Sequence, residues 1–157
     1  MNIHLISVGN RMPRWVDEGY TEYARRMPAE CSLRLLEIPP GRRGKGANIP
    51  RILQQEGERM VKAIPKHCGV IALDARGRSW TTEQLSVRLA EWLVAGRDLA
   101  LLVGGPEGLA RVCLERAEGR WSLSDLTLPH PLVRVVVAEQ LYRAWSLLRN
   151  HPYHRAG

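Results

Sequence analysis

The sequence predicts an α/β fold with an open, largely parallel sheet flanked by helices. Short apolar segments alternate along the chain with segments whose apolar residues recur at helical spacing. Parallel neighbours need a crossover connection, and that crossover is usually a helix. The length of 157 residues is close to the roughly 150 residues of a typical domain. We therefore expect a single domain over residues 1–157.

The first part of the chain begins with a strand and a helix. Residues 1–8 carry alternating apolar side chains before Gly9, a pattern typical of a strand followed by a turn. Residues 14–27 have their apolar side chains on one helical stripe. A second strand is expected over residues 33–38. The Pro-, Gly- and Arg-rich segment 39–46 then predicts a basic loop.

Capping residues mark the two middle helices. Asn48 is a suitable N-cap for a helix that runs to about residue 64, with a proline just inside its start. The apolar segment 68–74 predicts a third strand. Thr81 fits the first position of a capping box, because a glutamine follows three residues later, and Gly96 fits the end of that helix.

The next part of the chain is expected to hold two strands around a loop and a short helix. Residues 98–103 form a continuously apolar strand, and the glycine-rich segment 104–108 and a helix over 109–117 follow it. Residues 121–128 predict a fifth strand. Two prolines flanking His130 are expected to interrupt it.

The last helix, predicted over residues 132–149, is apolar around most of its circumference. A helix of that kind needs cover on two sides. The sheet can cover one side and a second copy of the chain the other, so we expect a homodimer. The alternative is a helix enclosed on both sides by the core of one chain.

Charge narrows the class of partner. Lys and Arg number 23 against 16 acidic residues, and 20 of the 23 are Arg. The Arg guanidinium pairs with phosphate in bidentate fashion, so this balance favours an RNA or DNA partner, although a genome-wide preference for Arg would leave the same mark.

Several other classes of protein are disfavoured. No apolar segment approaches 18 uninterrupted residues and the first residues lack a secretory pattern, so we expect a cytoplasmic protein with no membrane partner. The three cysteines fit neither a disulfide framework nor a CxxC pair. His151 and His154 stand three residues apart without a metal-binding pattern around them, so no metal is expected.

Ligands of open α/β sheets bind beyond the carboxyl ends of the strands. Three such ends are candidates here: residues 73–77, 104–108 and 126–131. At the second, Glu107 would repel the phosphate that a helix start attracts, whereas two adjacent glycines let the backbone approach an uncharged base or a cationic group. The alternative for this loop is a plain turn between a strand and a helix.

Four ordered motifs carry a resemblance to a known family. They are LDARG at 73–77, VGGPEG at 103–108, SLSDLTLPHPLVR at 122–134 and NHPYHR at 150–155. Together they closely resemble the bacterial 23S rRNA pseudouridine N3-methyltransferases of the SPOUT superfamily. The resemblance implies a C-terminal trefoil knot, a homodimer, S-adenosylmethionine as methyl donor, and a pseudouridine in helix 69 of the large-subunit rRNA as acceptor.

The resemblance also implies which residues contact the methyl donor. They follow three strands of the predicted sheet and are Leu73, Gly105, Ser124, Asp125, Leu126, Thr127, Leu128 and Pro129. Asp125 occupies a variable slot of the family's pattern, so its backbone rather than its carboxylate is expected to contribute.

Methylation of N3 requires that the acceptor lose its imide proton, and histidine is the usual general base near neutral pH. His154 in the tail and His130 beside the donor loop are the catalytic candidates, and His154 ranks first. Side chains of the basic loop and the tail are expected to contact the substrate RNA: Arg42, Arg43, Lys45, Tyr153 and Arg155. Each of these roles has an alternative. His130 can be a turn residue that is hydrogen-bonded by the backbone, the basic loop can be merely solvated, and the tail can be a frayed terminus.

Two other functions compete with this interpretation. A non-catalytic RNA-binding protein of ribosome assembly would account for the charge, but not for the loops at 104–108 and 126–131. A methyltransferase of the same fold could act on tRNA. Binding of S-adenosylmethionine would distinguish the methyltransferase from the non-catalytic RNA-binding protein. A comparison of ribosomes with tRNA as substrates would distinguish the rRNA enzyme from the tRNA enzyme.

Overall fold

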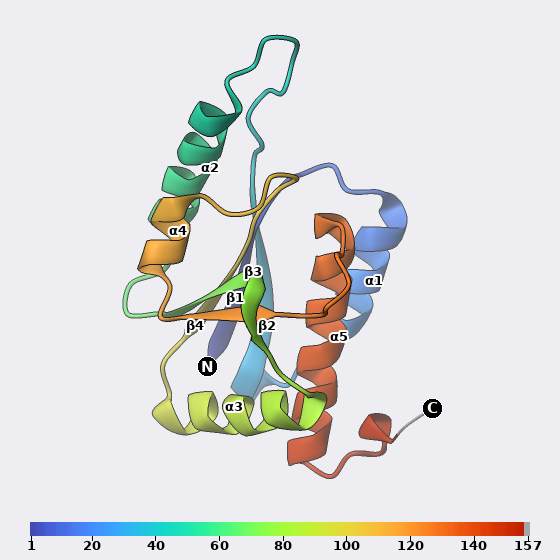
Figure 1. The fold of residues 1–157 in the computed structure, drawn as a ribbon. Helices are drawn as coiled ribbons and strands as arrows, with labels where there is room; N and C mark the ends of the chain where they lie inside the picture. Colours follow the sequence, from blue (N-terminus) through green and yellow to red (C-terminus); the bar gives the residue numbers. More distant parts are fainter. Residues whose placement is uncertain (156–157) are drawn as a thin grey trace.

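The computed structural model describes residues 1–155, which form one five-stranded sheet with helices on both faces (Figure 1). The strands have the order β2-β1-β4-β3-β5 and every neighbouring pair is parallel, which confirms the predicted α/β class. Their bounds are β1 (Asn2–Val8), β2 (Ser32–Ile38), β3 (Gly69–Ser79), β4 (Leu99–Val103) and β5 (Gly119–Ser122).

Five α-helices lie within residues 1–155. They are α1 (Arg14–Ala24), α2 (Ile49–Ala63), α3 (Thr82–Ala95), α4 (Arg111–Arg116) and α5 (His130–Leu148). Two single turns of 3₁₀ helix, η1 (Ala29–Cys31) and η2 (Pro152–His154), accompany them.

The sheet separates two apolar cores. On one face, Leu5 and Leu101 pack in a core to which α1, α3 and α5 contribute. On the other face, Ile6 and Leu102 pack with Met60 of α2 in a second core. Successive residues of a strand point to opposite faces, so the continuously apolar strands supply both cores. Figure 1 shows α2 and α4 on one side of the sheet and α1 and α5 on the other.

The predicted caps of the middle helices are confirmed. The side chain of Asn48 accepts a hydrogen bond from the N–H of Arg51 at 3.2 Å. Thr81 and Gln84 form the reciprocal capping box. Gly96 ends α3 in the left-handed conformation with φ of 66°, which a glycine adopts without steric cost.

The predicted strand over residues 121–128 is wrong beyond Ser122. The chain turns after β5, where the Ser122 hydroxyl donates to the carbonyl of Ser124 and the Ser124 hydroxyl accepts from the N–H of Leu126. The two prolines do not interrupt a strand either. Helix α5 begins at His130, with Pro131 in its first turn, because the first N–H groups of a helix have no partner within the helix.

Strand β3 is longer than the predicted segment 68–74 and contains an irregularity. Its pairing with β5 shifts register between Leu73 and Arg78, so that the intervening residues bulge. A Cβ atom at Gly77 would lie 2.7 Å from the backbone of Arg120 and Trp121. Only glycine allows the two strands to approach so closely after the bulge.

Helix α5 is covered mainly by its own chain. Val137, Ala138 and Leu141 are buried in the core on the sheet. On one side the Ser86 hydroxyl of α3 donates to the carbonyl of Ala144, and on the other side Val135 lies against Gly19 of α1. The alternative of a helix enclosed within one core therefore accounts for much of the apolar circumference. The trefoil knot stays a prediction from the resemblance.

The three cysteines are buried small side chains. Cys31, Cys68 and Cys113 are free thiols. Burial raises the pKa of Cys31 and of Cys113 to about 11. Both thiols therefore stay protonated at neutral pH, where only a thiolate is an effective nucleophile.

Candidate active site

A cavity lies between the middle of β3, where its pairing with β5 becomes irregular, and the carboxyl ends of β4 and β5. Its volume is about 140 Å³. Its lining comes from these strand segments, the loop after β5 and the first turns of α5, and consists of Leu73, Asp74, Ala75, Val103, Trp121, Ser122, Leu123, Ser124, Leu126, Thr127, Leu128 and Val133. The structure therefore brings together five of the residues expected to contact the donor: Leu73, Ser124, Leu126, Thr127 and Leu128.

Asp74 supplies a carboxylate to this cavity. One oxygen, Oδ1, accepts a hydrogen bond from the N–H of Arg76 at 3.1 Å. The other, Oδ2, is buried and has no hydrogen-bond partner, and the nearest cation is Arg120 at 3.8 Å. A buried acceptor of this kind costs free energy until a donor reaches it. Asp74 is thus a partly satisfied carboxylate in the cavity wall, with Arg76 Nε at 3.6 Å and Arg120 Nη1 at 3.8 Å.

The loop after β5 supplies five of the residues that line the cavity: Leu123, Ser124, Leu126, Thr127 and Leu128. Its conformation is held by the Ser122 and Ser124 hydroxyls, as described above. Leu126 leaves 75% of its surface exposed. Asp125 is exposed and does not line the cavity, so the expected contact of its backbone with the donor stays a prediction.

The Gly104–Gly108 loop is a closed turn. The N–H of Gly108 donates to the carbonyl of Gly105 at 3.0 Å, and Gly108 has a φ of 83°. A Cβ atom at Gly104 would lie 2.3 Å from the backbone of Gly108. The adjacent glycines were expected to admit a ligand, but Gly104 is required by the turn itself. A Cβ atom at Gly105 would instead face Val8 and Arg43.

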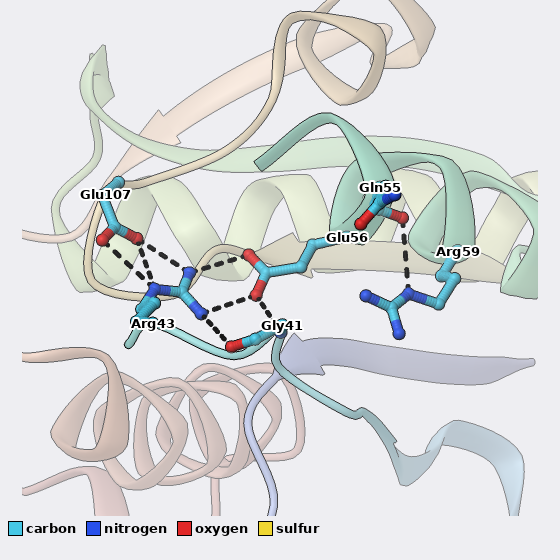
Figure 2. Close-up of polar contacts among 6 residues, drawn as sticks. All are labelled: Gly41, Arg43, Gln55, Glu56, Arg59 and Glu107. Carbon is cyan, nitrogen blue, oxygen red and sulfur yellow. Dashed lines mark hydrogen bonds and ion pairs between the residues drawn. The ribbon is translucent and has the colours of Figure 1, made fainter. Parts of the chain in front are cut away.

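Arg43 holds this turn through two carboxylates (Figure 2). Its Nη1 and Nη2 atoms donate to Glu56 at 2.8 and 2.9 Å, and its Nε and Nη2 atoms donate to Glu107 at 3.0 and 2.8 Å. Nη1 also donates to the carbonyl of Gly41. Arg43 was expected to contact RNA phosphate from a mobile loop. All five N–H groups of its guanidinium are engaged by the protein, and a contact of Arg43 with RNA stays a prediction.

His130 lies beside this network at the start of α5. Its Nε2 atom and Nη2 of Arg134 are each 3.5 Å from the position of a Cβ atom at Gly9. Arg134 is buried, and it donates to the carbonyl of Gly9 at 2.7 Å and to Glu37 at 2.8 Å. Burial, and then the charges of Arg134 and Arg43, lower the pKa of His130, and Glu107 opposes them. His130 is therefore neutral at neutral pH.

The tail lies at the other end of α5 from the cavity. The 19 residues of α5 span about 28 Å at about 1.5 Å per residue, and Figure 1 shows the last helical turn, in red, beside the far end of that helix. His154 therefore lies far from the cavity of its own chain. Its Nδ1 atom is buried without a hydrogen-bond partner.

Tyr153 anchors the tail to α5. Its ring centroid is 4.7 Å from that of Tyr142, and the guanidinium of Arg143 lies 4.9 Å from its centroid. Its hydroxyl donates to Glu139 at 3.0 Å. The ring was expected to be free for stacking on an RNA base. It packs against side chains of its own chain, beside His154 and the exposed Arg155, and its contact with RNA stays a prediction.

Comparison with known proteins decides the family. The model of the family described as "Predicted SPOUT methyltransferase" matches residues 1–154. The chain belongs to the SPOUT methyltransferase family. It is 65% identical over 155 residues to the Ribosomal RNA large subunit methyltransferase H of Thioalkalivibrio sulfidiphilus, covering 99% of each chain. It is 58% identical to the protein of the same name from Methylococcus capsulatus, covering 99% of this chain and 100% of the other.

A solved structure supports the fold. A methyltransferase from Legionella pneumophila, described as in complex with the bound cofactor SAM, matches with a TM-score of 0.50 at 12% sequence identity. The match covers 92% of this chain and 66% of the other. At this identity the likeness concerns the fold alone.

Two cations of this SPOUT methyltransferase remain free in the basic loop. Arg42 and Lys45 are exposed, and neither forms an ion pair with the residues that the structure describes. Within residues 1–155, no helix is long and apolar enough to cross a membrane. The same residues contain no cluster of three or more potential metal ligands.

Proposed function

We propose that this SPOUT methyltransferase transfers a methyl group from S-adenosylmethionine to N3 of a pseudouridine in helix 69 of 23S rRNA. The observation that carries this proposal is the cavity between the middle of β3, the end of β4 and the loop after β5, lined by five of the eight residues that the family resemblance implies for donor binding. The names of the two relatives and the formal charge of +7 support an rRNA substrate.

The cavity residues would hold the donor as follows. Asp74 would accept a hydrogen bond from a hydroxyl or amino group, because its Oδ2 atom is otherwise without a partner. The apolar walls, among them Leu73, Leu128 and Val133, would cover the adenosine part. The donor supplies an activated methyl group on a sulfonium, so positioning by these residues can contribute up to roughly 7–11 kcal/mol to the lowering of the barrier.

His130 would accept the N3 proton of the acceptor. It stands between Leu128 and Val133, which both line the cavity, whereas His154 of the same chain lies at the other end of α5. Within one chain we therefore rank His130 above His154 as the general base. A neutral imidazole is the form that a general base requires.

The pH dependence of the reaction tests the role of His130. Because the pKa of His130 is lowered from its ordinary value, the imidazole becomes protonated only below about pH 6.5. We expect kcat/KM for rRNA to fall with decreasing pH in that region. This fall is the acidic limb of the pH profile. His130→Gln should remove the acidic limb and lower the rate about 10²–10⁴-fold, while His154→Gln should retain the limb. A limb that persists in His130→Gln would assign the base elsewhere.

The free cations of the basic loop would contact phosphate. The affinity for rRNA falls as the salt concentration rises, and the steepness of this fall is the salt slope. If Arg42 and Lys45 each neutralise one phosphate, Arg42→Gln/Lys45→Gln should reduce the magnitude of this slope by about 1.4–1.8. The matched control is Lys62→Gln/Lys66→Gln, which removes two exposed charges near the far end of α2 and should leave the slope unchanged. Equal slopes for both variants would mean that the basic loop is merely solvated.

A homodimer would bring a tail to the cavity. The tail of one chain cannot reach its own cavity along α5, so His154 and Arg155 would serve the cavity of a second copy. Trp15 of α1 leaves 57% of its surface exposed, and Leu126 beside the cavity leaves 75%. Trp15 shares a helix face with Gly19, which contacts α5. These apolar side chains suit an interface between two copies around α1 and α5.

Donor binding is the first experiment that tests the proposed function. Calorimetry with S-adenosylmethionine should show binding, which a non-catalytic assembly factor would not. Incubation of labelled donor with ribosomes and with tRNA should then label the ribosomal RNA alone. Labelling of tRNA instead would favour the second rival.

A further inference from the structure

The Arg43 network joins three segments that are distant in the sequence. Glu56 lies on α2, Arg43 lies in the loop between β2 and α2, and Glu107 lies in the turn after β4. Figure 2 shows the guanidinium between the two carboxylates, with Gly41 at its edge. The side chain of Glu56 is 1% exposed, that of Arg43 is 21% exposed and that of Glu107 is 30% exposed. The network therefore runs from the interior to the edge of the Gly104–Gly108 turn.

Glu56 is the fixed end of this network. Its Oε2 atom accepts from the N–H of Gly41 and from Nη1 of Arg43, each at 2.8 Å, and its Oε1 atom accepts from Nη2 of Arg43 at 2.9 Å. A buried carboxylate with these partners has little freedom, since each of its hydrogen bonds is charge-assisted or made to the backbone. Arg43 is thereby oriented before it meets the turn.

The turn is the end that the network positions. Arg43 donates to both oxygens of Glu107, and its hydrogen bonds are the first cause that lowers the pKa of Glu107. Its Nη2 atom also lies 3.6 Å from the position of a Cβ atom at Gly105. The guanidinium thus lies against Gly105, two residues after Val103, the last residue of β4 and part of the cavity lining.

We propose that Arg43 and Glu56 are positioning residues for methyl-donor binding: they hold Glu107, and with it the Gly104–Gly108 turn, in the conformation that the donor requires. This proposal rests on the proposed function, since it takes S-adenosylmethionine as the ligand of the cavity. A planar guanidinium is necessary because one group must serve two carboxylates in different directions. A lysine ammonium keeps the charge but lacks that fork.

The test compares donor affinity among variants of the full chain. Calorimetry at a temperature well below every thermal midpoint gives Kd for S-adenosylmethionine and for S-adenosylhomocysteine. Arg43→Lys should raise both constants at least fivefold, and Glu107→Gln should raise them in the same direction. Because both changes act on one turn, the double variant Arg43→Lys/Glu107→Gln should be no weaker than Arg43→Lys alone.

Two controls on α2 separate positioning from general stability. Met60→Ala truncates a buried side chain one turn after Glu56 and should lower the thermal midpoint while Kd stays within twofold of the wild type. Arg59→Lys should change neither the thermal midpoint nor Kd. Arg59 donates a hydrogen bond to the carbonyl of Gln55 and takes no part in the Arg43 network (Figure 2).

The outcomes are distinguishable. A Kd for Arg43→Lys within twofold of the wild type would overturn the proposal, and so would an equal loss of affinity in Met60→Ala. If the wild type itself binds neither ligand, it is the proposed cofactor, and with it the proposed function, that fails. A fivefold loss confined to Arg43→Lys and Glu107→Gln supports the positioning role.

Discussion

Removal of residues 151–157 is expected to reduce methyl transfer to rRNA to background, while the affinity for S-adenosylmethionine stays within about twofold. The deletion removes His154 and the exposed Arg155, together with the Tyr153 anchor. The donor cavity lies about 28 Å away along α5, so its lining is untouched. The loss should therefore appear in kcat/KM for rRNA. The thermal midpoint should also fall, because Tyr153 packs against Tyr142 and Arg143.

Two point variants separate anchoring from direct RNA contact. Tyr153→Phe keeps the ring against Tyr142 and loses only the hydrogen bond to Glu139, so it should retain most activity. Tyr153→Ala releases the tail and should approach the deletion, since base contacts made by an unfixed tail must first order it. If the deletion abolishes donor binding outright, the tail belongs to the donor cavity and this division of roles is wrong.

Arg43→Met is expected to cause the largest loss of stability among single substitutions at the site. It leaves the buried Glu56 carboxylate without its cation. Breaking a buried ion pair from one side costs about 3–5 kcal/mol. At about 2–4 °C per kcal/mol for a domain of this size, the thermal midpoint should fall by roughly 6–20 °C.

The double variant Arg43→Met/Glu56→Met is the control for that prediction. It replaces both charges by apolar side chains of similar length, so no buried charge is left without a partner. We expect it to recover much of the free energy of unfolding lost in Arg43→Met. A double variant that is less stable than Arg43→Met would mean that Glu56 stabilises the fold through Gly41 rather than through Arg43.

The elements of the fold were predictable where local chemistry determines them. Asn48 and Thr81 cap their helices because their side-chain oxygens can satisfy N–H groups of the first turn. The partner N–H groups lie three residues further along the chain, so the sequence alone indicates the caps. The apolar strands likewise follow from their residues. Segments 68–74 and 121–128 were predicted less well, because the bulge of β3 and the early end of β5 depend on which strand pairs with which.

The candidate site was predictable in its location but not in its polar contacts. The strand ends and the family motifs indicated the loops that form the cavity. Asp74 lay within the candidate segment 73–77, but it was not singled out as a contact of the donor. The role of Arg43 could not be read from the sequence, because Glu56 and Glu107 stand 13 and 64 residues away from it and only the tertiary fold brings them together.

Mass spectrometry of 23S rRNA is the most direct test of methyl transfer to N3 of the helix 69 pseudouridine. Ribosomes whose helix 69 pseudouridine lacks the methyl group would be incubated with the full chain and isotopically labelled S-adenosylmethionine. We expect one labelled methyl group on N3 of that pseudouridine with the wild type. We expect none with His130→Gln over the same time. A methyl group at another position, or on no rRNA nucleotide at all, would contradict the proposed function.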